Sequence, residues 1–275
     1  MTVSTPPSMR DKASVMKMVE QVSTGNVRAV SRLITLLENH DRDGTAALDL
    51  LVSSSSHAAV IGITGYPGAG KSTVVAQLIT AYRRLGVKVG VLAVDISSPV
   101  TGGALLGDRI RMQEHTLDQK VYIRSMATRG QHGGLSAATR GATSVLKAAG
   151  YEIILIETIG VGQNEVDVLD IADTVVAVVA PGLGDEVQAM KAGLLEVAHI
   201  VVVNKSDLAG ADTTLRDLMD CCPTVLQTIA TSGKGISDLV AAIAEHQQGQ
   251  SSSSIQRKLR PVSRRVSEEQ SGGNH

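Results

Sequence analysis

The residues with the clearest chemistry form one stretch, Gly65-Tyr66-Pro67-Gly68-Ala69-Gly70-Lys71-Ser72. It fits the phosphate-binding pattern G-x-x-x-x-G-K-[ST]. In that pattern the glycines let backbone N–H groups wrap the phosphates, the lysine reaches the β- and γ-phosphates, and the hydroxyl ligates Mg²⁺. A glycine-rich turn that binds nothing is the alternative. The predicted nucleotide-binding residues here are Gly65, Gly68, Ala69, Gly70, Lys71, Ser72 and Thr73.

The elements on either side of this loop favour the phosphate site. Residues 59–64 form a short apolar run that reads as a buried strand, and residues 72–85 carry apolar side chains at helical spacing. A strand, a glycine loop and a helix in that order point backbone N–H groups and a helix N-terminus at an anion. We therefore expect Lys71 to act on the phosphates and Ser72 to act on the metal.

Acidic residues follow two further predicted strands. Asp95 comes after the run 87–94, and Glu157 comes after the run 153–156, with Gly160 shortly beyond it. An acid at the carboxyl end of a strand beside a phosphate loop is placed to contact a metal or water. We expect Glu157 to hold Mg²⁺ through water and the Gly160 N–H to face the γ-phosphate. For Asp95, capping of the following turn is a serious alternative.

A second motif points to the base. The predicted strand 199–203 ends in Asn204-Lys205-Ser206-Asp207, which matches the guanine-recognition signature N-K-x-D. The Asp207 carboxylate can accept from guanine N1–H and from its 2-amino group, and adenine lacks both donors there. The Lys205 stem would lie across the base, and Asn204 would tie this loop to the phosphate loop. After a further strand, at 224–230, Thr231, Ser232 and Gly233 resemble the loop that offers a backbone N–H to guanine O6.

The order of the elements predicts the fold. Apolar strands alternate with helices, so we expect an α/β fold with a mostly parallel sheet and helices on both faces. Three helical stretches precede the first strand, the third at 45–51. They could act as a lid or docking surface, but covering one sheet edge is the favoured interpretation. The predicted division is an N-terminal helical extension at 1–56, a nucleotide-binding domain at 57–248 and a disordered Ser-rich and basic tail at 249–275.

The composition argues against a nucleic-acid partner and against a membrane-spanning segment. The 275 residues include 26 Lys and Arg against 27 Asp and Glu, so no overall field indicates a nucleic-acid partner. Phe and Trp are absent, which removes most stacking platforms for single-stranded nucleic acid. No apolar run is long enough to span a bilayer, and no signal-peptide pattern is visible. Cys221 and Cys222 are adjacent and suit a reducing compartment. We expect a cytoplasmic protein, or a mitochondrial matrix protein in a eukaryotic host.

The motifs together resemble one family, the methylmalonyl-CoA mutase-associated GTPases, also called MeaB or ArgK. The resemblance runs from about Lys12 to His246. The motifs that carry it, in order, are 65–73, Val94-Asp95-Ile96-Ser97-Ser98-Pro99, 101–103, Leu106-Gly107-Asp108-Arg109, 124–130, Glu157-Thr158-Ile159-Gly160-Val161-Gly162-Gln163, 181–185 and 204–207.

This resemblance implies a P-loop GTPase that binds GTP, GDP and Mg²⁺. Its metal environment would be Ser72, Asp95, Asp108 and Glu157, and its partner would be an adenosylcobalamin-dependent acyl-CoA mutase. The protein would gate cofactor loading and protect the mutase. A transport-linked ATPase or kinase, as an older family name suggests, and a metal-delivery GTPase are the alternatives. The family's long C-terminal dimerisation arm is replaced here by the tail at 249–275, so we expect a monomer or a weak dimer.

Overall fold

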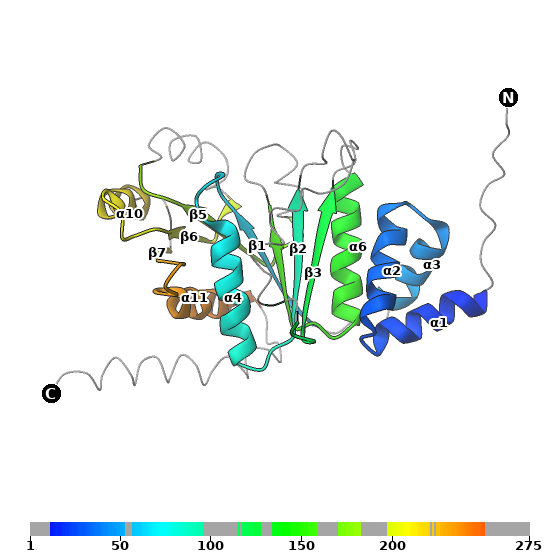
Figure 1. Cartoon of the computed structure of the whole chain (residues 1–275). Helices are drawn as coiled ribbons and strands as arrows, with labels where there is room; N and C mark the ends of the chain where they lie inside the picture. Colours follow the sequence, from blue (N-terminus) through cyan, green and yellow to red (C-terminus); the bar gives the residue numbers. More distant parts are fainter. Residues whose placement is uncertain are drawn as a thin grey trace, which may run out of the picture. The chain divides into compact units, whose positions relative to one another are not determined.

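The computed structural model describes residues 12–52, 57–95, 115, 117–127, 134–158, 170–182, 197–220, 222 and 224–250. These residues belong to two compact units. The first unit combines the N-terminal helices with residues 137–151, and the second contains the sheet (Figure 1). Asp108, Gly160 and the tail from 251 lie outside the described residues.

The first unit is a group of helices. It contains α1 (Lys12–Ser23), α2 (Val27–Glu38), α3 (Arg42–Val52) and most of α6 (Gly134–Ala148). Apolar side chains at helical spacing are buried within it, among them Val22, Leu33 and Leu51. Asn26 caps α2, because its side chain accepts the Ala29 N–H at 3.1 Å. The predicted N-terminal helices are therefore present.

The second unit is built on a seven-stranded sheet with the order β3-β2-β4-β1-β5-β6-β7, and every pairing is parallel. The strands are β1 (Ala59–Thr64), β2 (Val89–Asp95), β3 (Val121–Ala127), β4 (Ile153–Glu157), β5 (Thr174–Val179), β6 (Ile200–Val203) and β7 (Val225–Gln227). Every residue of β1, β4, β5 and β6 is buried, in agreement with their mostly apolar sequences.

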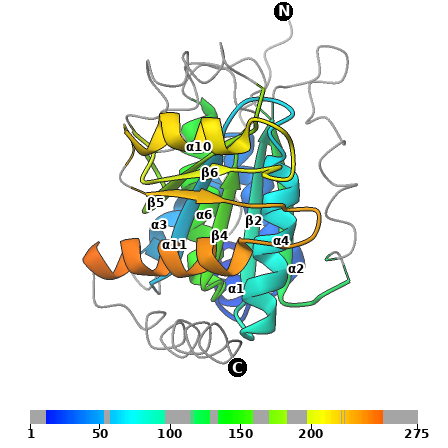
Figure 2. The same cartoon turned by 90° about the vertical axis from the view of Figure 1, so that its left-hand side faces the viewer.

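Helices cover both faces of this sheet, as predicted. On one face, α4 (Lys71–Arg84) and α11 (Ile236–Gln250) bury Leu78 and Leu239 against Ile61 and Val176. On the other face, α10 (Ala211–Met219) buries Leu218 against Val201. Figure 2 shows α10 and α11 on opposite sides of β6. Because all strands are parallel, their carboxyl ends meet at one edge, where such sheets bind ligands.

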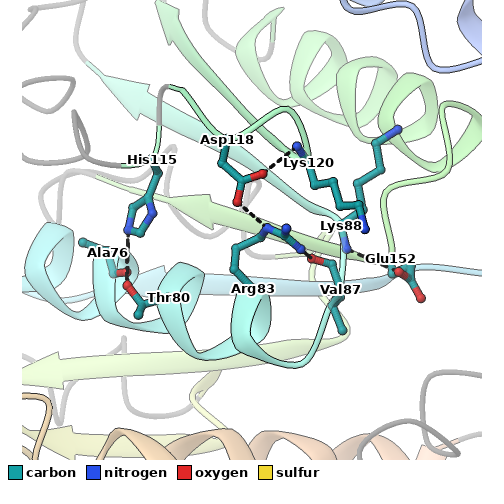
Figure 3. A network of polar contacts seen from close by, with 9 residues as sticks. All are labelled: Ala76, Thr80, Arg83, Val87, Lys88, His115, Asp118, Lys120 and Glu152. Carbon is teal, nitrogen blue, oxygen red and sulfur yellow. Dashed lines mark hydrogen bonds and ion pairs between the residues drawn. The ribbon is translucent and has the colours of Figure 1, made fainter.

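Polar contacts hold the back of α4 to the segment that leads into β3. The Nε2 atom of His115 lies 3.1 Å from the Ala76 carbonyl oxygen and 3.3 Å from the Thr80 hydroxyl. One turn further along, Arg83 Nε donates to Asp118 Oδ2 at 2.7 Å (Figure 3). These contacts fix the helix that begins at Lys71.

Two element ends differ from the prediction. We expected the last strand to run to Ala230, but β7 ends at Gln227. The chain turns there because the Thr228 hydroxyl and the Ala230 N–H both donate to the side chain of Asn204. The closing helix α11 continues to Gln250, two residues into the segment that we predicted to be tail. Among the described residues, no helix is long and apolar enough to cross a membrane.

Candidate functional site

The glycine loop follows β1 directly and turns into α4. Gly65 has φ of +133°, and a Cβ there would collide with the backbone carbonyl of Val178 on β5. Gly70 precedes the helix with φ of +94°, and a Cβ there would collide with the Asn204 amide. Both positions therefore require glycine, because of the left-handed backbone and because of the close approach. The loop lies tightly against two other carboxyl-edge segments.

The lysine of the motif is buried beneath this loop. Its Nζ donates to the Gly65 carbonyl oxygen at 2.6 Å and to the Tyr66 carbonyl oxygen at 3.1 Å. The ammonium group is thus held against the first two residues of the loop. Gly70, the N-cap residue of α4, has no side chain that could make a capping hydrogen bond. A positive charge and a helix N-terminus at one place suit a bound phosphate.

The hydroxyl of the motif meets the acid predicted to serve the metal. Ser72 Oγ donates to Glu157 Oε1 at 2.6 Å, although the two residues are 85 positions apart. Both side chains are buried. The pairing follows from the topology, because β4 lies beside β1 and Glu157 is level with Ile63. Two predicted metal residues are therefore brought together by the fold.

This pair has the chemistry that Mg²⁺ selects. A hydroxyl oxygen and a carboxylate oxygen are hard donors, and Mg²⁺ is bound through one or two carboxylates plus phosphate oxygens and water. Asp95 is the last residue of β2, two positions beyond the residue level with Glu157, so its backbone reaches the same edge. The residues present fit the ion. The predicted contributions of Asp108 and Gly160 fall outside the described residues.

Asn204 joins three segments at the carboxyl edge. Its Nδ2 donates to the Ala69 carbonyl oxygen in the glycine loop at 2.9 Å. Its Oδ1 accepts the Thr228 hydroxyl at 3.0 Å and the Ala230 N–H at 3.1 Å. The side chain is buried, so these bonds are made away from water. The expected tie between this motif and the glycine loop is present, and it extends to the segment after β7.

A pocket of about 220 Å³ opens beside Asn204. It is lined by Gly70, Thr73, Asn204, Lys205, Asp207, Leu208, Ile229, Ala230 and Thr231. Asp207 supplies a carboxylate and is exposed, whereas Leu208 and Ile229 supply apolar surface. Lys205 has φ of +56°, an uncommon backbone conformation for a residue with a side chain. A flat base with N–H donors on one edge suits an apolar pocket with a carboxylate at its rim.

The loop after β7 presents one of its three predicted residues to the pocket. Thr231 lines it. The Ser232 hydroxyl instead donates to the Ile229 carbonyl oxygen at 3.1 Å, and the Gly233 N–H donates to the Ala230 carbonyl oxygen at 3.3 Å. These bonds shape the loop. Base recognition by Ser232 and Gly233 stays a prediction.

Sequence reasoning missed four residues of the site. Leu208, Ile229 and Ala230 line the pocket, and Thr228 bonds to Asn204. Leu208 directly follows the N-K-x-D motif, so its place in the sequence could have indicated that it lines the pocket. Thr228 carried no signal, because a threonine in a predicted strand is ordinary.

Comparison with known proteins places this arrangement among GTPases. The profile of the family described as methylmalonyl Co-A mutase-associated GTPase MeaB matches residues 30–271. A Pyrococcus horikoshii relative whose name assigns it to the GTPases is 49% identical over 245 residues, covering 84% of this chain and 77% of that protein. The mouse protein named methylmalonic aciduria type A homolog, mitochondrial, is 39% identical over 201 residues, covering 68% of this chain and 48% of that protein.

One solved structure agrees in fold. The crystal structure of a LAO/AO transport system kinase superposes with a TM-score of 0.71 at 25% sequence identity. The match covers 96% of this chain and 85% of that one. The predicted fold class, a parallel nucleotide-binding sheet preceded by helices, is confirmed.

Proposed function

This chain belongs to the methylmalonyl-CoA mutase-associated GTPase family and hydrolyses GTP, and from that premise we propose that it serves as a GTP-dependent chaperone of an adenosylcobalamin-dependent acyl-CoA mutase. In this role, the nucleotide state gates loading of the cofactor onto the mutase and protects the loaded enzyme. Guanine nucleotide is the ligand that the pocket and the glycine loop would share.

The observation that carries the nucleotide assignment is the bond between Asn204 and Ala69. It joins the loop suited to phosphates to the pocket with a carboxylate at its rim. Asp207 would accept from guanine N1–H and from the 2-amino group. ATP lacks both donors and would leave this carboxylate without its partners, which favours GTP.

Phosphate binding is assigned to the loop and α4. Lys71 would move its ammonium group from the loop carbonyls to the β- and γ-phosphates, and the first N–H groups of α4 would face the same oxygens. Ser72 and Glu157 would hold Mg²⁺ in place of their mutual hydrogen bond. The ion would supply positive charge that neutralises the phosphate oxygens. Asp95, Asp108 and the Gly160 N–H are assigned to the same environment as sequence-based proposals.

The mutase partner rests on the relatives. The family description names association with methylmalonyl-CoA mutase, and the mouse relative is named for methylmalonic aciduria. We propose slow hydrolysis by the protein alone, with stimulation by the mutase. Gln163 is offset from the usual catalytic position after the glycine, and partner-dependent GTPases turn over slowly by themselves.

Affinity capture from the native host tests the partner. The protein is immobilised with GDP in one arm and with a non-hydrolysable GTP analogue in the other, and captured enzymes are identified. We expect an acyl-CoA mutase whose retention depends on the nucleotide. The purified mutase is then titrated into a GTP turnover assay, with Lys71→Ala as the inactive control. No capture, together with turnover that the mutase leaves unchanged, would refute the chaperone role.

A transport-linked kinase is the second candidate, favoured by the name of the solved structure above. Such an enzyme would use ATP. Competition between ATP and GTP for a fluorescent GDP analogue separates the two functions. Preference for GTP by orders of magnitude supports the GTPase, whereas equal competition supports the kinase.

A further inference from the structure

Two histidines meet at the amino-terminal edge of the sheet, at the opposite end of β6 from Asn204. His199 directly precedes β6, and His246 lies near the end of α11. Their ring centroids are 4.2 Å apart, and the ring planes are tilted by 40°. Both rings are partly buried. The contact therefore links the last turns of α11 to the edge of the sheet.

The hydrogen bond of His199 fixes its protonation state. Its Nδ1 atom accepts the Val175 N–H at 2.9 Å. A backbone N–H can only donate, so Nδ1 must carry a lone pair, and the ring must be the neutral form protonated at Nε2. A proton on Nδ1 would place two donors against each other. The folded arrangement of His199 thus excludes the imidazolium.

His246 is bound differently. Its Nδ1 lies 3.0 Å from the hydroxyl of Thr174, a fully buried residue at the start of β5. A hydroxyl can donate or accept, so this contact is compatible with either protonation state of His246. Burial lowers the pKa of His246. Burial, and secondly the neighbouring His246, lower the pKa of His199.

Among the described residues, α4, α11 and the residue before β5 carry these charged groups: Lys71, Arg83, Arg84, Asp173, Asp238 and Glu245. Asp173 accepts the Val60 N–H at 2.8 Å, and Arg83 pairs with Asp118. Glu245 and Arg84 are exposed, where solvent screens their charges. The strands β5 and β6 carry no ionisable side chain at all. Neither strand therefore supplies a carboxylate to a protonated histidine.

We propose that His199 and His246 form an acid-sensitive contact that holds the end of α11 against the sheet and weakens when His199 takes up a proton. Two imidazolium rings at this distance would repel each other, and His199 would lose its bond to Val175. The pH dependence of the stability follows from the difference between the folded and unfolded pKa of His199. The folded pKa lies below the ordinary value of 6.5, so the stabilisation is complete above that value and is lost as pH falls from it toward the folded pKa.

Titration of the intact protein provides the first test. The histidine Cε1–H signals are followed by NMR between pH 4.5 and 8, on the order of the range where imidazole titrates. We expect the His199 signal to titrate below the ordinary midpoint of 6.5. A midpoint at or above that value would overturn the proposal. His246→Gln removes the neighbouring ring, so it should move the His199 midpoint upward.

Unfolding equilibria provide the second test. The slope of the unfolding constant against pH gives the protons taken up on unfolding. His199→Asn keeps an acceptor for the Val175 N–H and cannot take a proton, so proton uptake on unfolding between pH 5 and 7 should be smaller than in the wild type, by at most about one proton. His57→Asn is the matched control, because His57 is an exposed histidine of the same unit. An equal slope in wild type and His199→Asn would contradict the proposal.

Discussion

Asn204 Nδ2 donates to the carbonyl oxygen of Ala69 at 2.9 Å, across 135 positions of sequence. The same side chain accepts from Thr228 and Ala230, so a single buried amide fixes the glycine loop, its own loop and the loop after β7. The position of the glycine loop and the position of the base pocket therefore both depend on this one side chain. Loss of the amide should therefore reduce both stability and nucleotide binding.

Asn204→Ala removes three hydrogen bonds and leaves their partners buried. Since each buried polar group left unpaired costs about 1–3 kcal/mol, we expect the free energy of unfolding to fall by about 3 kcal/mol or more. Urea titration measures this loss, and GDP affinity should drop with it. Asn204→Asp keeps the acceptor for Thr228 and Ala230 but turns an oxygen toward Ala69, so it isolates that contact. Wild-type stability in both variants would show that the amide does not hold the loops.

Asp207→Asn should change the choice of base and leave the fold intact. Asp207 is exposed at the pocket rim, so its substitution should alter the free energy of unfolding by no more than about 0.5 kcal/mol. An amide offers an N–H where the carboxylate offered only acceptors, which suits the additional oxygen of xanthine. Competition by GTP and XTP for a bound fluorescent nucleotide measures the shift. An unchanged preference for GTP would remove Asp207 from base recognition.

Ser72→Ala should weaken the response to magnesium. The substitution deletes the hydroxyl that meets Glu157 and that we assign to the ion. The Mg²⁺ concentration needed for half-maximal GTP turnover should rise by about tenfold or more, on the scale seen when metal sites lose a supporting group. Thr80→Ser, which alters a hydroxyl at the back of α4, is the control. The same Mg²⁺ dependence in Ser72→Ala and wild type would contradict this assignment.

Local signals explain what could be predicted from the sequence. β1, the glycine loop and the N-K-x-D motif are each formed by consecutive residues. Each can therefore be recognised from its own short stretch of sequence. The contacts of Thr228 with Asn204 and of His199 with His246 join distant positions, and no local pattern marks them. The strand at β7 was predicted too long because Ile229 and Ala230 look like strand residues. Their conformation is decided instead by the Asn204 side chain.

The helix α6 illustrates the same limit. Its sequence predicts a helix after β3, but nothing in its periodicity indicates that residues 137–151 group with α1, α2 and α3. Gly141 on α6 lies close to Leu37 and Leu48. In the sequence, a glycine within a helix suggests only a locally less stable helix. In the structure, Gly141 allows close packing against Leu37 and Leu48.

The ion pair between Arg83 and Asp118 should be lost in acid. The bond from Arg83, followed by the Lys120 N–H, lowers the pKa of Asp118 below its ordinary value of 3.8. A lowered carboxyl pKa stabilises the fold above the ordinary value, and the effect is lost as pH falls from that value through the folded pKa. Because the Asp118 side chain is 34% exposed, Asp118→Asn should cost no more than about 1 kcal/mol near neutral pH.

Unfolding of wild type and Asp118→Asn between pH 3 and 7, on the order of the carboxyl titration range, measures the stabilisation by this ion pair. The two stabilities should converge toward the acid end, and added salt should narrow the neutral difference. Asp49→Asn, at an exposed site on α3, is the control. A difference that is constant across the whole pH range would show that charge plays no part in the contact.

Tyr82→Phe should stabilise the protein. Tyr82 is a fully buried residue of α4, and its hydroxyl has no hydrogen-bond partner among the described residues. Burial raises the pKa of this phenol well above its ordinary value. A buried hydroxyl without a partner retains its cost of desolvation, so removing it while keeping the ring should raise the free energy of unfolding by about 1 kcal/mol. Tyr82→Ala, which empties the site, should lower it by about 3–5 kcal/mol.

Thermal and urea unfolding of the two variants measure both effects. The alanine variant shows that the assay is sensitive to this position, so a gain in the phenylalanine variant is interpretable. Tyr82 belongs to the core cluster and does not line the pocket, so GTP turnover in Tyr82→Phe should match the wild type. A loss of more than about 1 kcal/mol in Tyr82→Phe would mean that the hydroxyl makes a bond in solution, since phenylalanine retains nearly all of the apolar contact.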